Sequence, residues 1–129
     1  MPEPTAHPML DADQLLRANL DRVFNERNAE RRDLAIAELY VADPIMYEPA
    51  KEVVGRVAIS EIADQLQKQF GETFNFNAQG KGGGHHGMAT LRWVAGTASQ
   101  AAMFRGTDVV ELVDGRISRL WVMFDASSP

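Results

Sequence analysis

The sequence predicts an α+β domain in which three helices come before an antiparallel sheet. Apolar residues recur at helical spacing in most of the chain up to Gly71, and they alternate with polar residues from Thr73 onward. The dipeptide Asp114-Gly115 lies in the alternating half and is typical of a tight type I′ hairpin turn. Helices and strands that are separated in this way place the helices on one face of the sheet. No linker or repeat is visible, so we expect one domain over residues 1–129.

The first expected helix begins at Asp11 or Asp13, because either carboxylate can accept hydrogen bonds from the free N–H groups of a helix start. Residues 1–10 are expected to form a frayed lead-in. Asn19 belongs to the polar side of this helix. Its apolar side consists of Leu15, Leu16, Leu20, Val23 and Phe24.

A second, short helix follows Asn28 and the charged stretch 30–32, which interrupt the first pattern. It ends before Pro44, because a proline pushes the preceding residue out of the helical region. Its expected buried side consists of Leu34, Ala35, Leu39 and Tyr40.

Residues 45–48 are expected to form a short strand, since Pro44 and Pro49 bound a run too short for a helix. The third helix opens at Gly55 and ends at Gly71, a usual C-terminal residue for a helix. Its apolar stripe consists of Val57, Ile59, Ile62, Ala63, Leu66 and Phe70.

Beyond the third helix, the alternation predicts four strands in an antiparallel meander. The glycine-rich run 80–84 is expected to be a flexible hairpin connection, and the last strand extends over residues 116–124. The expected inner face of the first three of these strands includes Phe74, Phe76, Ala78, Ala89, Leu91, Trp93, Phe104, Asp108, Val110 and Leu112.

Composition excludes several classes of function. The net charge is -5 at pH 7, and the Lys and Arg residues are scattered, which argues against a nucleic-acid partner. We expect the one adjacent basic pair, Arg31-Arg32, to be solvated. The absence of cysteine excludes disulfides, thiolate zinc sites and cysteine nucleophiles, and it fits a cytoplasmic location. No apolar run approaches the roughly 20 residues of a spanning helix, so no membrane partner is expected.

Six short motifs follow one another over nearly the whole domain: Leu39-Tyr40-Val41-Ala42-Asp43-Pro44, Tyr47-Glu48-Pro49, Gly55-Arg56-Val57-Ala58-Ile59, Leu91-Arg92-Trp93, Gly106-Thr107-Asp108 and Asp114-Gly115-Arg116-Ile117. In this order and spacing the chain resembles the SnoaL-like and ketosteroid-isomerase-like branch of the NTF2-like superfamily. The resemblance implies a cone-shaped fold, with three helices packed on a strongly curved, mixed but mainly antiparallel sheet around one pocket. It also implies a homodimer formed through the sheet. The chemistry must be argued from the site, because the superfamily contains isomerases, cyclases, dehydratases, epoxide hydrolases and non-catalytic members.

Asp108 is the first candidate catalytic residue. It shares strand parity with Phe104 and Val110, which places one carboxyl group on the face expected to be buried. Burial without a partner raises the pKa of a carboxyl group. The resemblance implies that a carboxyl kept neutral in this way donates a hydrogen bond to an oxyanion. The alternative is an aspartate that satisfies a backbone group or faces an open pocket mouth.

Glu48 is the second candidate, because the resemblance places it where the isomerases have a general-base aspartate. A carboxylate there could move a proton at a carbon next to a carbonyl, or it could be an exposed rim residue. Phe24 falls near the position of a tyrosine that completes the oxyanion hole of the isomerase relatives. Phenylalanine has no donor, which argues against true ketosteroid isomerase activity.

His85 and His86 are adjacent on a strand, so at most one of them enters the pocket. The parity of Leu91 and Trp93 favours His85, unless a bulge at the glycines reverses it. His85 would then be an auxiliary acid or base, and the alternative is an ordinary polar rim residue. We expect no metal site, because the third histidine, His7, lies in the lead-in.

The remaining candidates concern binding. We expect the residues that line the pocket and contact the ligand to be Phe24, Tyr47, Trp93, Phe104, Trp121 and Met123. The outward set of Met88, Thr90 and Val109, with Val122 as a further candidate, is more apolar than a free surface needs. This favours a symmetric homodimer through the sheet face.

The sequence leaves open whether the protein is an enzyme. The first hypothesis is an isomerase or cyclase-type enzyme without an organic cofactor, moving a proton on a small apolar carbonyl compound. The second is a non-catalytic ligand-binding or structural dimeric module. The third is a hydratase or an epoxide hydrolase, which would need Arg105 to point inward, against its parity.

Overall fold

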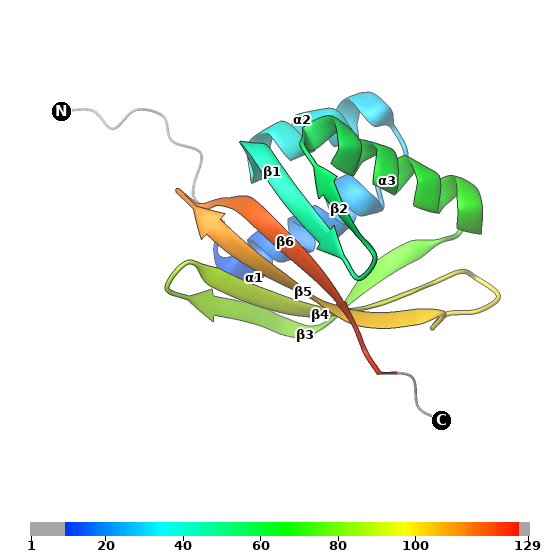
Figure 1. Ribbon diagram of the computed structural model, residues 1–129. Coiled ribbons are helices and arrows are strands. Elements are labelled where there is room, and N and C mark those ends of the chain that lie inside the picture. Colours follow the sequence, from blue (N-terminus) through cyan, green and yellow to red (C-terminus); the bar gives the residue numbers. More distant parts are fainter. Residues whose placement is uncertain (1–9, 127–129) are drawn as a thin grey trace.

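The computed structural model describes residues 10–126 (Figure 1). Its helices are α1 (Ala12–Asn19), a π-helical turn η1 (Leu20–Phe24), α2 (Ala29–Leu39) and α3 (Arg56–Phe70). Its strands are β1 (Tyr40–Glu48), β2 (Lys51–Val54), β3 (Asn75–His85), β4 (Met88–Gly96), β5 (Phe104–Val113) and β6 (Arg116–Phe124). Residues 1–9 of the expected lead-in lie outside the described residues. None of the helices in the described part is long and apolar enough to cross a membrane.

The six strands form one sheet in the order β2-β1-β6-β5-β4-β3. All neighbours are antiparallel except β1 and β6, which are parallel, so the expected mixed, mainly antiparallel sheet is confirmed. The sheet curls around the helices, so that β1 packs against α2 and α3 while β3 and β4 pack against α1 (Figure 1). The α+β class with three helices before most of the sheet is therefore confirmed.

The start of α1 lies at the first of the two expected positions. The Asp11 carboxylate accepts a hydrogen bond from the Gln14 backbone N–H at 2.8 Å, and the Gln14 side chain accepts one from the Asp11 N–H at 3.0 Å. This reciprocal pair satisfies two backbone donors that a helix start leaves free. The helix continues directly into η1, which the Asn25 N–H closes on the Leu20 carbonyl.

The structure of α2 corrects two expectations. The charged stretch lies inside the helix, because the Asn28 side chain caps it by accepting the Arg31 N–H at 2.9 Å. Leu34 is 71% exposed, because the buried face follows Arg32, Ala35, Ile36 and Leu39 at helical spacing.

Arg32 is buried, so the expectation that both arginines of the pair are solvated is wrong for it. Its guanidinium donates to the Glu26 carbonyl, the Ser60 carbonyl and the Gln67 Oε1. These bonds join α2 to α3, and they give the charge the hydrogen-bond partners that burial requires.

The helix α3 has the expected bounds. Gly55 and Gly71 flank it with φ of +95°, a value that favours glycine at both ends. Ile59 and Ala63 are buried as expected, but Val57 is 73% exposed because it falls outside the stripe that faces the sheet.

The strand expected at residues 45–48 begins earlier, at Tyr40, because the chain leaves α2 directly into parallel pairing with β6. The register along β6 shifts between Tyr40 and Ile45, the stretch that contains Pro44, which has no N–H to pair. The short strand β2 was not predicted; it returns antiparallel to the end of β1.

The glycine-rich run 80–84 is not a connection but the second half of β3, and the turn lies at His86-Gly87. A Cβ on Gly84 would lie 2.0 Å from the Met88 carbonyl oxygen, so glycine permits a close approach to β4. By contrast, the predicted hairpin at Asp114-Gly115 is confirmed, with positive φ at both residues.

Candidate functional site

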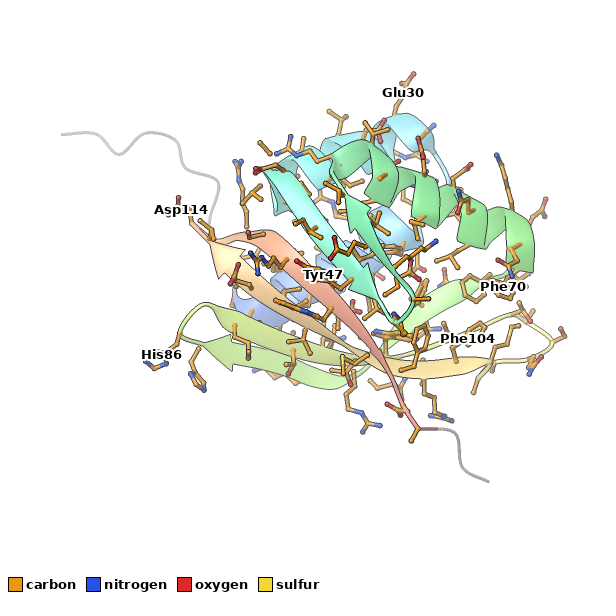
Figure 2. The ribbon with its side chains drawn as sticks, viewed as in Figure 1. Glu30, Tyr47, Phe70, His86, Phe104 and Asp114 are labelled. Carbon is orange, nitrogen blue, oxygen red and sulfur yellow. The ribbon has the colours of Figure 1, made fainter. Side chains whose placement is uncertain are left out.

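A cavity of about 200 Å³ lies between the helices and the inner face of the sheet. All six phenylalanines of the chain line it: Phe24, Phe70, Phe74, Phe76, Phe104 and Phe124. They come from η1, α3, β3, β5, β6 and the segment before β3, and several of them meet edge to face. In Figure 2 the labelled Phe70 and Phe104 lie at the same end of the molecule. Such a cavity suits a compact, flat, apolar molecule.

Two carboxyl groups interrupt this apolar lining. Among the described residues, Glu48 and Asp108 are the ionisable side chains that line the cavity, and Gln69 adds one amide. No Lys or Arg side chain of the described residues lines it. The cavity therefore offers hydrogen bonds and a proton-transfer group, but no cation for an anionic ligand.

Asp108 lies in the middle of β5 and is 4% exposed. It stands opposite Leu91 on β4 and Val122 on β6, so its carboxyl group lies between two apolar neighbours on the inner face. The Trp93 indole donates a hydrogen bond from Nε1 to Oδ1 at 2.9 Å. Burial raises the pKa of Asp108 to about 7, although the Trp93 hydrogen bond acts in the opposite direction. The position of Asp108 agrees with its expected placement on the inner face. A carboxyl group with such a pKa is neutral in a large share of molecules at neutral pH.

Glu48 is the last residue of β1 and lies at the other polar position of the cavity. Its Oε1 is buried and forms no hydrogen bond, and the Lys51 ammonium lies 3.8 Å from it. This distance fits an ion pair but is too long for a hydrogen bond. One carboxylate oxygen of this lining residue is thus buried beside a cation.

A buried polar pair lies next to this site, and of its two members the sequence predicted the burial of Tyr40 but not that of Asn19. The Tyr40 hydroxyl donates to Asn19 Oδ1 at 2.5 Å, and both residues are fully buried. Burial and, to a smaller degree, the Asp108 carboxylate raise the pKa of Tyr40. Asn19 was expected on the polar side of the first helix, but it lies three residues after Leu16 and four before Val23, and this spacing could have revealed its place in the buried stripe.

The histidines lie away from the cavity. His85 and His86 are exposed at the turn between β3 and β4, and their Nδ1 atoms are 2.7 Å apart. Figure 2 shows His86 at the opposite end of the molecule from Phe70 and Phe104. The expectation that His85 enters the pocket is wrong, because the hairpin turn lies at His86-Gly87 and not at the glycine run 80–84 where the connection was expected.

Three of the six expected lining residues lie at the cavity, namely Phe24, Trp93 and Phe104. The other three, Tyr47, Trp121 and Met123, do not line it. Tyr47 and Trp121 instead stack on each other, with ring centroids 5.3 Å apart.

A bulge in β6 explains the error for Trp121 and Met123. Glu111 pairs with Arg119 and Leu112 pairs with Ile117, so Ser118 is an extra residue that reverses the parity of the strand. Leu120, Val122 and Phe124 therefore line the cavity. For the same reason, the expectation that Val122 points outward is wrong.

The comparisons with known proteins concern the fold. No protein-family model matches the sequence, and no curated protein matches it. A solved structure assigned as an isomerase of the SnoaL-like family, from Agrobacterium tumefaciens, superposes with a TM-score of 0.78 at 22% identity, covering 87% of this chain and 95% of the other. One assigned as a ketosteroid isomerase, from Kribbella flavida, gives 0.67 at 20% identity, covering 92% and 81%. One assigned as a SnoaL-like polyketide cyclase, from Jannaschia sp. CCS1, gives 0.72 at 9% identity, covering 95% and 92%.

These likenesses establish the fold. The chain has the NTF2-like fold, an α+β cone with an internal cavity. More particularly, its structural neighbours are SnoaL-like and ketosteroid-isomerase-like proteins.

Proposed function

We propose that this protein is a cofactor-independent enzyme of the isomerase or cyclase type, which moves a proton on a small, largely apolar carbonyl compound. The observation that carries the proposal is the pairing of Glu48 and Asp108 as the two carboxyl groups of one aromatic cavity. Their surroundings differ, and two titratable groups in different surroundings are the usual basis of separate acid and base roles.

In the proposed reaction Glu48 is the general base. Its carboxylate removes a proton from a carbon next to the ligand carbonyl, and the electron pair moves onto the carbonyl oxygen. Asp108 in its neutral form donates a hydrogen bond to that oxygen as its negative charge develops. Glu48 then returns the proton to another carbon, so that the reaction is balanced without an oxidant or a cofactor.

The cavity supports an uncharged ligand of modest size. A dry apolar cavity of roughly 150 Å³ holds a benzene-sized molecule, so about 200 Å³ suits a small ring compound. A charged carboxylate or phosphate group would find no cation among the described lining residues.

A non-catalytic ligand-binding protein is the second candidate, and one observation favours it. Phe24 lines the cavity, and the resemblance places a tyrosine near this position in the isomerase relatives, so a second donor to the oxyanion is lacking there. Loss of one such donor typically lowers the rate by about two to three orders of magnitude. A hydratase or epoxide hydrolase is less well supported, because Arg105 is exposed and does not line the cavity.

Hydrogen–deuterium exchange tests the proposed reaction. Small cyclic ketones and enones are incubated with the protein in D2O, and NMR measures deuterium entry at the carbons next to the carbonyl. We expect exchange with the wild type and none with the double variant Glu48→Gln/Asp108→Asn. The matched control is Glu52→Gln/Glu111→Gln, since both residues lie outside the cavity. Saturable ligand binding without any exchange would favour the non-catalytic candidate.

We also propose that the protein forms a homodimer through the outer face of the sheet. Met88 and Met123 are 56% and 54% exposed there, and the stacked Tyr47 and Trp121 lie on the same sheet outside the cavity. Sedimentation tests this: Met123→Glu should give monomers, whereas Val57→Glu on α3 should leave the dimer intact. A monomeric wild type would contradict the proposal.

A further inference from the structure

The hydrogen bond that holds Asp108 has a fixed direction. An indole N–H can donate but cannot accept, so Trp93 Nε1 is the donor and Asp108 Oδ1 the acceptor. Among the described residues no second hydrogen bond to this carboxyl is found, and Asp108 lines the cavity. Because Oδ1 is the accepting oxygen, the proton of the neutral acid belongs on Oδ2. The hydrogen bond from Trp93 therefore leaves Oδ2 as the donor oxygen of a carboxyl group that lines the cavity.

The indole itself is held tightly. Trp93 stands opposite Gly106 on β5, and a Cβ on Gly106 would lie 2.6 Å from Trp93 Cζ2. Gly106 thus lets the ring lie against the strand backbone. Phe76 and Phe124 meet the indole edge to face, with centroids 5.2 and 5.9 Å away. These neighbours leave Nε1 little freedom, so the position of the ring sets the position of the carboxyl.

We propose that Trp93 is a positioning residue, which fixes the Asp108 carboxyl so that Oδ2 presents its proton to the carbonyl oxygen of the ligand. This role rests on the proposed proton-transfer function and adds a residue to it. It is distinct from lining the cavity, because it depends on the N–H of the indole and not on its ring alone.

The chain contains a matched control for this role. Its second tryptophan, Trp121, lies outside the cavity and stacks on Tyr47. The change Trp121→Phe therefore removes an indole N–H without touching Asp108. It also leaves Trp93 as the sole tryptophan, whose fluorescence then reports on the group bonded to Nε1.

The first experiment is a fluorescence titration that needs no substrate and no change at Trp93. We expect the Trp121→Phe protein to show one transition with a midpoint near pH 7, the pKa of Asp108. The transition should disappear in Trp121→Phe/Asp108→Asn. The titratable groups nearest this pair are Tyr40, which ionises at much higher pH, and Glu48 across the cavity. A transition that survives Asp108→Asn, or no transition at all, would overturn the proposed pairing.

The second experiment compares Trp93→Phe with Trp121→Phe. Phenylalanine keeps an apolar ring but cannot donate, so the Asp108 midpoint, followed by NMR of the side-chain carboxyl, should move to higher pH. We expect kcat for exchange to fall about ten- to hundredfold with little change in KM, because a misplaced group loses rate more than affinity. Trp121→Phe should change neither quantity. An unchanged midpoint and an unchanged kcat in a folded Trp93→Phe protein would refute the role.

The two experiments separate this inference from the function on which it rests. If the fluorescence titration behaves as expected but no carbonyl compound exchanges, the hydrogen bond stands and the proposed reaction fails. If exchange occurs but its pH profile is the same in Trp93→Phe as in the wild type, the reaction stands and Trp93 only lines the cavity.

Discussion

Glu48 and Asp108 face the same cavity from two different parts of the sheet. Asp108 lies in the middle of β5, between two paired strands, and its one hydrogen bond comes from an indole. Glu48 ends β1, and its side chain is 25% exposed beside Lys51. The middle of the sheet excludes water, and this burial raises the pKa of Asp108, whereas the end of β1 leaves the Glu48 side chain partly exposed beside a cation. This difference in position is the basis of the two roles that we propose.

The largest expected effect is on the base. Glu48→Gln should lower the exchange rate about a thousandfold, because an amide cannot accept the proton. Glu52→Gln, in β2 and outside the cavity, should leave the rate unchanged. The measurement is the initial rate of deuterium entry by NMR. Equal loss in both variants would show that Glu48 is not the base.

The next effect is on the free energy of unfolding, which depends on pH because the pKa of Asp108 is raised in the folded protein. Between about pH 4 and 7 the unfolded chain releases the Asp108 proton while the native protein keeps it, so the free energy of unfolding falls as the pH rises. The difference between pKa values of 3.8 and about 7 corresponds to at most about 4 kcal/mol. Asp108→Asn does not titrate, so it should be more stable than the wild type above pH 7 and should lose that advantage near pH 4.

Urea unfolding at several pH values measures this difference. Glu111→Gln is the control on the same strand, because Glu111 lies opposite Arg119 outside the cavity. If Asp108→Asn is the less stable protein at every pH, the carboxyl supports the fold and is not a group held neutral by burial.

A third prediction adds the donor that the cavity lacks. Phe24→Tyr places a hydroxyl on a lining residue, and we expect the exchange rate to rise about tenfold, part of the effect of a well-placed oxyanion donor. Phe70→Tyr, on another wall, should not raise it. A fall in rate with Phe24→Tyr and unchanged folding would show that the hydroxyl does not reach the carbonyl oxygen.

The smallest effect is expected at Lys51. The Lys51–Glu48 ion pair is 3.8 Å long and Lys51 is more than half exposed, so Lys51→Met should change the free energy of unfolding by less than about 1 kcal/mol. Urea unfolding of Lys51→Met beside the wild type measures this difference. A loss well above about 1 kcal/mol would show that the ion pair supports the end of β1.

The sequence predicted the site where the sheet is regular. The pairing of β4 and β5 runs without a register shift from Met88 to Ala95, so alternation placed Trp93 and Asp108 on the inner face correctly. It failed where one residue is added or where the turn moves. The bulge at Ser118 turns Trp121 and Met123 to the outer face of the sheet. Because the glycine run 80–84 belongs to β3, His85 lies at the tip of the hairpin.

Buried polar residues were the second source of error. The patterns treat Arg32 and Asn19 as surface residues, because a charge or an amide is usually exposed. Both are buried through partners that are distant in the sequence: the Ser60 carbonyl and Gln67 for Arg32, and Tyr40 for Asn19. The spacing of Asn19 could have shown its buried position, but the distant partners that make burial of either residue favourable cannot be recognised from local spacing.

The π-helical turn η1 gives the cavity a means of changing its wall without rearranging the sheet. A π turn holds one more residue than an α-helical turn, and here both Leu20 and Phe24 reach the cavity from it. Deleting one residue within 20–24 would restore α-helical spacing and rotate every later side chain of the segment by about 100°. A different residue would then replace Phe24 at the wall, while the strands that carry Glu48 and Asp108 keep their register. A single-residue deletion is thus a route to a new ligand shape with the same pair of carboxyl groups.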